Sequence, residues 1–247
     1  MKELLKERIA MLDVQNLYAG YGRLPVLNDV SIRVEKGEFV ALIGPNGVGK
    51  TTLMRAISGV LAPSAGTIGF LGRDIAGMDA YRVNRLGLSF ITESGDLFAG
   101  MKVSENLNLG AYTIRDKARI KQQREKIYAL FPRLAERQAQ LAGTLSGGER
   151  KMLSIARGLM CDPRLVMVDE PSGGLAPNLV LDVFKSLKRL SNTGVTILLV
   201  EQNVNSTLKI VDRAYVLEQG RIVLEGPAGE LSRDTHVRNS YLGLGAA

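Results

Sequence analysis

The sequence predicts an α/β fold with a mixed, mainly parallel β-sheet, an antiparallel β portion near the N-terminus and an inserted α-helical lobe. Three observations predict it. Apolar strand-like runs alternate with helical segments. A glycine-rich turn joins one of these runs directly to a helix, and a polar, helix-rich stretch at about 95–160 separates the early strands from the late ones. We expect one domain over residues 11–247, preceded by an N-terminal extension over residues 1–10.

The first half of the chain supplies the early strands. LDVQNL, VSIRV and FVALI are short β-like runs, and TIGFL and LGLSFI follow the glycine-rich turn and its helix. In the polar stretch, apolar residues recur at helical spacing between Ile120 and Leu134, with Pro132 as a break. These positions predict the helical lobe.

The second half returns to strands. LVMV, TILLV and AYVL are apolar runs, and the helical segment LVLDVFKSLKRL separates the first two. Gly194 stands where a helix cap is expected. Strands that alternate with helices in this way predict a parallel sheet covered on both faces.

Composition narrows the possible functions. No apolar run approaches the roughly 18 residues of a membrane helix, and the start MKELLKERIA lacks the apolar core of a signal peptide, so we expect a cytosolic protein. The net charge is +7, but the basic run RDKARIKQQR has no interleaved aromatic residues, so a solvated helix face is favoured over nucleic-acid binding. The single cysteine, Cys161, and the single histidine, His236, build neither a disulfide nor a metal site.

The strongest chemical signal is GPNGVGKTT, directly after FVALI. Glycines let backbone N–H groups turn toward phosphates, and the following helix points its positive end at them. Lys50 is expected to reach the outer phosphates, and the Thr51 hydroxyl is expected to bind Mg²⁺. The candidate nucleotide-binding residues of this loop are Gly44, Pro45, Asn46, Gly47, Val48, Gly49, Lys50, Thr51 and Thr52.

Two acids follow the apolar run LVMV, at a strand's carboxyl end, where α/β folds place their ligands. Asp169 is the candidate magnesium residue. Glu170, one residue further on, is the candidate general base that polarises an attacking water.

A third motif, LSGGE, precedes a segment with helical spacing. Ser146, Gly147, Gly148 and Glu149 would form a second anion site at a helix start, although a plain helix cap is the more frequent meaning of such a turn. Two phosphate sites in one chain suggest a dimer.

In this order and spacing, the phosphate loop, LSGGE and LVMVDEP resemble the ATPase subunits of ABC transporters, over about residues 11–244. The resemblance implies a P-loop NTPase core that binds ATP and Mg²⁺ and powers transport from the cytoplasmic face of the membrane. It implies that two subunits enclose two ATP molecules, with the Ser146 loop of one closing on the nucleotide of the other. It also implies that Tyr21, in YAGYG, stacks on adenine.

Four further loops, ITES, LFPRLAER, PSGGLAP and LLVEQNV, are similar to the second ATPase subunit of branched-chain amino-acid importers. That similarity implies membrane permeases, a second ATPase subunit or a second copy of this chain, and an external solute-binding protein as partners. Importers of urea and amides share much of the pattern, so the solute stays open.

Two positions depart from the wider family. Glu93 stands where most members carry a metal-sensing Gln, and it can still accept bonds from metal-bound water. Gln202 stands where most members carry a histidine near the γ-phosphate. Its amide can donate a hydrogen bond but cannot exchange a proton as imidazole does, so we expect Glu170 to have the main catalytic role. A heterodimer with a histidine-bearing ATPase would let the two sites differ.

Three other functions fit the sequence less well. An ABC ATPase that acts on DNA or ribosomes would usually need paired domains or a long coiled coil. A small-molecule kinase would have no use for LSGGE. A regulatory module that binds ATP without splitting it is disfavoured by intact Lys50, Asp169 and Glu170.

Overall fold

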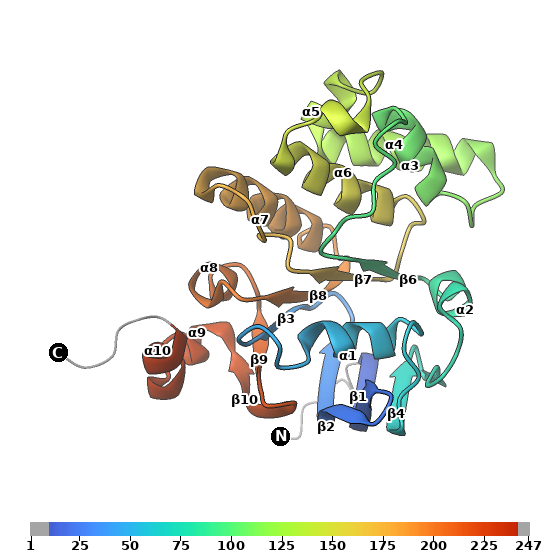
Figure 1. Cartoon of the computed structure of the whole chain (residues 1–247). Helices are drawn as coiled ribbons and strands as arrows, with labels where there is room; N and C mark the ends of the chain where they lie inside the picture. Colours follow the sequence, from blue (N-terminus) through green and yellow to red (C-terminus); the bar gives the residue numbers. More distant parts are fainter. Residues whose placement is uncertain (1–9, 242–247) are drawn as a thin grey trace, which may run out of the picture.

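The computed structural model describes residues 10–241 of the chain. The expected N-terminal extension, residues 1–10, lies outside these residues except for Ala10, which begins the first strand. The described residues form two β-sheets and a group of helices above the larger sheet (Figure 1).

The larger sheet has six strands in the order β10-β9-β3-β8-β7-β6. All neighbouring strands are parallel except β10, which pairs antiparallel with β9. The strands are β3 (Phe39–Ile43), β6 (Leu88–Ile91), β7 (Leu165–Asp169), β8 (Thr196–Glu201), β9 (Arg213–Glu218) and β10 (Arg221–Pro227).

The smaller sheet is antiparallel, with the order β2-β1-β4-β5. Its strands are β1 (Ala10–Tyr21), β2 (Leu24–Glu35), β4 (Ala65–Phe70) and β5 (Arg73–Asp74). Strands β1 and β2 alternate buried and exposed residues over much of their length, as expected for strands with one face on a core.

The inserted lobe lies between β6 and β7 and forms the upper part of Figure 1. Its helices are α3 (Val103–Gly110), α4 (Lys117–Leu130), α5 (Pro132–Glu136) and α6 (Gly147–Leu159), with a 3-10 turn η1 (Ala142–Thr144). Pro132 begins α5 directly after α4, because a proline is tolerated in the first turn of a helix and not in its interior.

The remaining helices connect or follow the strands. They are α1 (Lys50–Ile57), α2 (Ala80–Arg85), α7 (Pro177–Ser191), α8 (Val204–Leu208), α9 (Ala228–Leu231) and α10 (Thr235–Tyr241). Within residues 10–241, none is long and apolar enough to cross a membrane.

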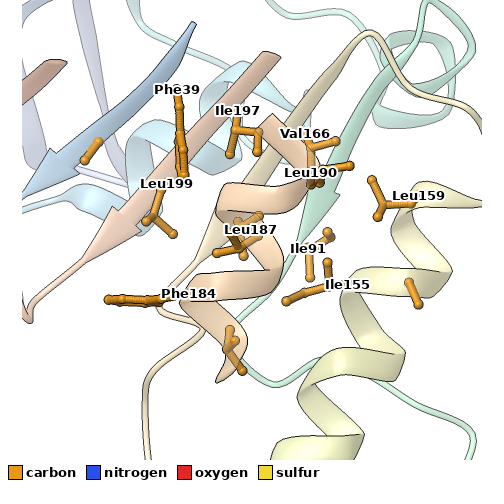
Figure 2. Close-up of a cluster of buried hydrophobic side chains, with 14 of the residues drawn as sticks. Phe39, Ile91, Ile155, Leu159, Val166, Phe184, Leu187, Leu190, Ile197 and Leu199 are labelled. Carbon is orange, nitrogen blue, oxygen red and sulfur yellow. The ribbon is translucent and has the colours of Figure 1, made fainter. Parts of the chain in front are cut away.

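Successive side chains along each strand point to opposite faces of the large sheet, and both faces are buried. On β3, Phe39 and Ala41 belong to a core shared with the helical lobe and α7, whereas Val40 and Leu42 belong to a core shared with α1 and the small sheet. Figure 2 shows the first core, where α6 side chains such as Ile155 lie toward Ile91 and α7 side chains such as Leu187 lie toward Leu199. The sheet is therefore held between two layers, which fixes the loops at its edge.

The α/β fold, the antiparallel N-terminal portion and the inserted helices match the sequence prediction. The strands differ in extent: β1 and β2 each run for 12 residues, where only short apolar runs were expected. Strands β5 and β10 were not predicted. β5 has two residues, and β10 alternates intermediate and exposed positions at the sheet edge, so neither carries an apolar signal.

Candidate nucleotide site

Strand register brings four loops to one edge of the large sheet. Ile43, the residue before the glycine-rich loop, pairs with Glu201 of β8. Asp169 of β7 pairs with Val200, and Ile91 of β6 pairs with Val168. Because neighbouring parallel strands end together, the segments that follow β3, β6, β7 and β8 meet at their carboxyl ends.

The glycine-rich loop occupies residues 44–49, between β3 and α1. Gly47 and Gly49 have positive φ angles of 81° and 110°, a region that favours glycine. At Gly49 a Cβ atom would lie 2.7 Å from the Leu27 side chain of β2, so the loop also packs too closely for a larger residue there. The open N-terminal turn of α1 begins at Lys50 and directs its free N–H groups toward this loop.

Lys50 is buried, with a relative exposure of 4%. Its ammonium donates to the carbonyl oxygens of Gly44, at 2.9 Å, and Pro45, at 2.8 Å. It also pairs with Glu170 Oε1 at 3.0 Å. The Lys50 ammonium therefore joins the glycine-rich loop to Glu170, the acid that follows β7.

Asp169 lies at the end of β7 and is 2% exposed. Burial raises the pKa of its carboxyl group, as do the nearby Glu170 and Glu93 carboxylates, while a contact with the Thr51 side chain lowers it. Its Oδ1 atom is buried without a hydrogen-bond partner among the described residues. A buried carboxylate oxygen with no donor is a fitting ligand for a cation.

Within residues 10–241, no three His, Cys, Asp or Glu side chains gather as a metal cage. The donor set at Asp169 is instead a carboxylate beside the Thr51 hydroxyl. It resembles a magnesium site that is completed by water and substrate phosphates, since Mg²⁺ is usually bound by one or two protein ligands together with phosphate.

Glu170 adopts a left-handed backbone conformation, with φ of 41°. For a residue with a side chain this costs on the order of 1–3 kcal/mol and is found preferentially at functional sites. Backbone bonds hold the turn: Glu170 N donates to Val200 O at 2.9 Å, and Gly173 N donates to Glu170 O at 3.1 Å. The turn lets the Glu170 carboxylate reach Lys50.

The remaining residues at this edge are Glu93 and Gln202. Glu93 lies on the loop after β6, and a Cβ atom on Gly173 would be 3.4 Å from its Oε1, so its carboxylate lies beside the turn that follows Glu170. Gln202 directly follows β8, with its side chain exposed. Both candidates therefore lie on loops that border the acids.

Sequence reasoning missed Glu201, which is 1% exposed. Its carboxylate accepts bonds from Ser172 N at 2.9 Å, Ser172 Oγ at 2.7 Å and Gln202 N at 3.2 Å. Burial raises the pKa of Glu201, and the Ser172 bonds oppose that rise. It ties the turn after Glu170 to the turn at Gln202. An acid that ends an apolar strand, the signal already used for Asp169, could have identified it.

Tyr21 ends β1 and is 44% exposed. Its hydroxyl accepts a hydrogen bond from Arg55 of α1 at 3.0 Å. Since α1 begins at the glycine-rich loop, this bond places the exposed Tyr21 ring on the same side of the fold as that loop. Arg55 was also missed, because nothing local in the sequence links it to Tyr21.

The Ser146 loop is not part of this cluster. Ser146 caps α6: its Oγ accepts from Glu149 N at 3.3 Å and donates to Glu149 Oε2 at 2.8 Å. Glu149 also pairs with Arg137 at 2.7 Å. Burial opposes ionisation of Glu149, but the Ser146 bonds and the Arg137 charge outweigh it and hold its pKa below the usual range. These contacts are to the helical lobe rather than to residues 44–52.

The fold and the site define a nucleotide-binding protein with a phosphate loop. Residues 27–173 match the family model described as ABC transporter. The high-affinity branched-chain amino acid transport ATP-binding protein BraG of Pseudomonas aeruginosa is 43% identical, over 94% of this chain and 100% of its own. The probable branched-chain amino acid transport ATP-binding protein LivF of Archaeoglobus fulgidus is 38% identical, over 95% and 99%.

Another relative belongs to an export system. The lipopolysaccharide export system ATP-binding protein LptB of Escherichia coli is 32% identical, over 95% of this chain and 98% of its own. Among solved structures, the ADP conformation of an ATP-binding cassette of an ABC transporter superposes with a TM-score of 0.85 at 30% identity, covering 95% of this chain and 99% of that one.

The chain belongs to the ABC transporter family. It is an ATP-binding, ATP-hydrolysing subunit that powers a transporter.

Proposed function

We propose that this chain hydrolyses MgATP at the cytoplasmic face of the membrane to drive an importer of branched-chain amino acids. The contact between Lys50 and Glu170, at 3.0 Å, is the observation that carries the ATPase site. It joins a phosphate-binding loop to a candidate general base. The names of the relatives at 43% and 38% identity support the solute.

Nucleotide binding falls to the loop of residues 44–52 and to Tyr21. Backbone N–H groups of the loop and of the first turn of α1 bind phosphate oxygens, and the helix dipole favours their negative charge. The Lys50 ammonium, already aimed by the Gly44 and Pro45 carbonyls, binds the outer phosphates. The exposed ring of Tyr21, held by Arg55, stacks on adenine.

Thr51 and Asp169 would hold magnesium, and Glu93 would accept hydrogen bonds from water bound to the ion. The unpartnered Oδ1 of Asp169 supports this assignment. Bound Mg²⁺ would offset charge on the β- and γ-phosphates. The ion would also favour ionised Asp169, against the effect of burial.

Glu170 is the general base. A phosphate group that draws Lys50 away frees the Glu170 carboxylate to accept a proton from water. The water oxygen then bonds to the γ-phosphorus, the bond to the β–γ bridging oxygen breaks, and ADP leaves with that electron pair. Gln202 donates a hydrogen bond to the γ-phosphate but takes no proton.

A second subunit completes the site. Ser146, Gly147, Gly148 and Glu149 lie at the start of α6 in the helical lobe, and within the described residues the side chains of Ser146 and Glu149 make no hydrogen bond or ion pair with Lys50 or Glu170. In this proposal they bind the nucleotide of a partner. The partner is a second ATPase subunit or a second copy of this chain. Release of the Ser146 hydroxyl from Glu149 would supply the hydrogen bond to phosphate.

Permease subunits are the membrane partners, and they link the chain to an external solute-binding protein. A cavity of about 390 Å³ opens between the loop after β6 and the lobe helices. Phe98, Leu109 and Tyr112 line it and are exposed by 53%, 41% and 65%. Exposed aromatic residues around a hollow are typical of protein interfaces, and nucleic acid is not expected there.

The test is transport by the reconstituted complex. Proteoliposomes that contain this chain, its permeases and its binding protein should accumulate labelled leucine only with MgATP. Glu170→Gln should keep ATP binding and lower turnover by about 100-fold or more. Turnover in that variant at the normal rate would refute the assignment of Glu170 as general base. Transport of urea, an amide or an exported lipid in place of leucine would refute branched-chain amino acids as the solute.

A further inference from the structure

The loop that carries Glu93 is closed on itself. The Asp96 carboxylate accepts hydrogen bonds from the Thr92 and Ser94 hydroxyls, at 2.8 and 2.6 Å. Gly95 N donates to Thr92 O at 3.1 Å. The polar side chains at both ends of the loop are therefore satisfied within it, and several of its carbonyl oxygens turn toward α6.

One face of α6 binds these carbonyls. Lys151 Nζ donates to Glu93 O at 2.6 Å, and Ser154 Oγ donates to Gly95 O at 3.1 Å. Arg157 donates to Gly95 O at 3.1 Å and to Asp96 O at 2.7 Å. The three donors are spaced three residues apart, so they follow one another along the helix face that meets the loop.

The packing leaves little room between the helix and the loop. Gly95 has a φ of 72°, and a Cβ atom there would lie 3.2 Å from Ser154 Cβ. A Cβ atom on Gly158 would lie 2.6 Å from the Ile91 side chain of β6. The helix therefore rests directly on β6 and on the loop that follows it.

Lys151 also faces the acids of the site. It is half-buried, and burial lowers the pKa of its ammonium, while the nearby carboxylates of Glu93, Glu201, Asp169 and Glu170 oppose that effect. Glu93 carries a negative charge where most members of the family have a neutral Gln. The Lys151 ammonium offsets that added charge.

We propose that Lys151, Ser154 and Arg157 are positioning residues that fix the Glu93 loop to the helix beginning at Ser146. The magnesium side of this chain's own site and the anion loop offered to a partner then move as one body. This inference rests on the proposed roles of Glu93 and Ser146. It adds a physical link by which a change at one composite site reaches the other.

Hydrogen–deuterium exchange of the full chain, without metal or nucleotide, tests the link itself. Lys151→Met and Ser154→Ala should each speed exchange in residues 93–97, by about tenfold for Lys151→Met, which removes a charged donor. Lys121→Met, which removes the same charge from the exposed face of α4, should leave these residues unchanged. Unaltered exchange in 93–97, or an equal rise throughout the chain, would overturn the inference.

Kinetics of the assembled transporter provide the second measurement. Lys151→Met should lower kcat about tenfold while ATP affinity of the isolated chain stays within about twofold. Lys151→Arg keeps a cation and its donors and should retain most turnover. Normal kcat in Lys151→Met, or an equal loss in Lys151→Arg, would overturn the link alone. An absence of ATP hydrolysis by the wild-type complex would instead refute the proposed function.

Discussion

Lys50 shows how a single residue organises the site before nucleotide arrives. Its ammonium binds two carbonyls of its own loop and one carboxylate from the neighbouring strand end. The carbonyl bonds aim the side chain, and the contact with Glu170 occupies the carboxylate that we propose as the general base. In the proposed mechanism phosphate competes with that carboxylate for Lys50, which would link nucleotide binding to activation of the base.

Lys50→Ala should lower ATP affinity about ten- to a hundredfold, because a charge-assisted hydrogen bond contributes about 1.5–3 kcal/mol. Calorimetry with ATP and magnesium measures the change. Lys36→Ala, at an exposed lysine in the turn between β2 and β3, is the matched control and should bind as the wild type does. Equal affinity in the two variants would refute the role of Lys50.

The candidate site residues that the sequence indicated are close to one another in the chain. Those of the glycine-rich loop and the pair Asp169–Glu170 each lie within a few positions, and the strand before each motif is apolar and buried. Contacts such as Glu201 with Ser172, and Lys151 with Glu93, join residues 29 and 58 positions apart. No local pattern encodes such pairs, because strand register and helix packing create them.

Helix α6 has two proposed roles on different parts of its surface. Its N-cap and first turn contain Ser146 and Glu149, the candidate anion site, and its next two turns bind the loop after β6. The capping box stabilises the helix start, since a lost serine cap typically costs about 1 kcal/mol. A substitution at Ser146 therefore alters both the helix end and whatever that end would bind.

Ser146→Arg should abolish ATP-dependent association of subunits while the isolated chain keeps its ATP affinity within about twofold, since Ser146 lies outside the Lys50 cluster. Light scattering measures association, with Glu170→Gln present to trap the ATP-bound state. Ser146→Ala loses the same cap without added bulk, and its weaker effect separates obstruction from helix destabilisation. Loss of nucleotide binding by isolated Ser146→Arg would count against a shared site.

Helix α10 is attached through a carboxylate. Glu218, at the end of β9, accepts a hydrogen bond from Tyr241 and lies 2.8 Å from His236 Nε2. The Tyr241 bond and then the His236 bond hold the pKa of Glu218 below its usual range. A lowered folded-state pKa adds stability above the unfolded value of about 4.3, and that stability is lost as pH falls through the folded value.

We therefore expect α10 to detach as the pH falls below the unfolded value of about 4.3, before the sheet unfolds. Limited proteolysis or hydrogen exchange at residues 235–241 across an acid series would detect it. Glu218→Gln removes the titrating group, so detachment in that variant should depend little on pH over the same range. Equal pH dependence in both proteins would exclude Glu218 as the cause.

In the proposed mechanism the two lobes divide the chemistry. The edge of the large sheet contains the candidate phosphate loop and the acids, and the inserted lobe contains the candidate anion site at Ser146 (Figure 1). The fold class was predictable because alternating strand and helix patterns report burial directly. The division into two half-sites was expected only from resemblance, since no spacing in one chain tells whether two phosphate loops face each other.

This division makes turnover a property of the assembly. In the proposed mechanism a single chain supplies Lys50 and Glu170 to one nucleotide but must receive a Ser146-type loop from a partner, and Gln202 supplies no imidazole. We expect the isolated chain to hydrolyse ATP slowly and a histidine-bearing second ATPase to raise turnover by about tenfold or more. Phosphate release from each subunit alone, from the mixture and from a mixture with Ser146→Arg measures this. Isolated protein that matched the full complex would show that two copies of this chain suffice.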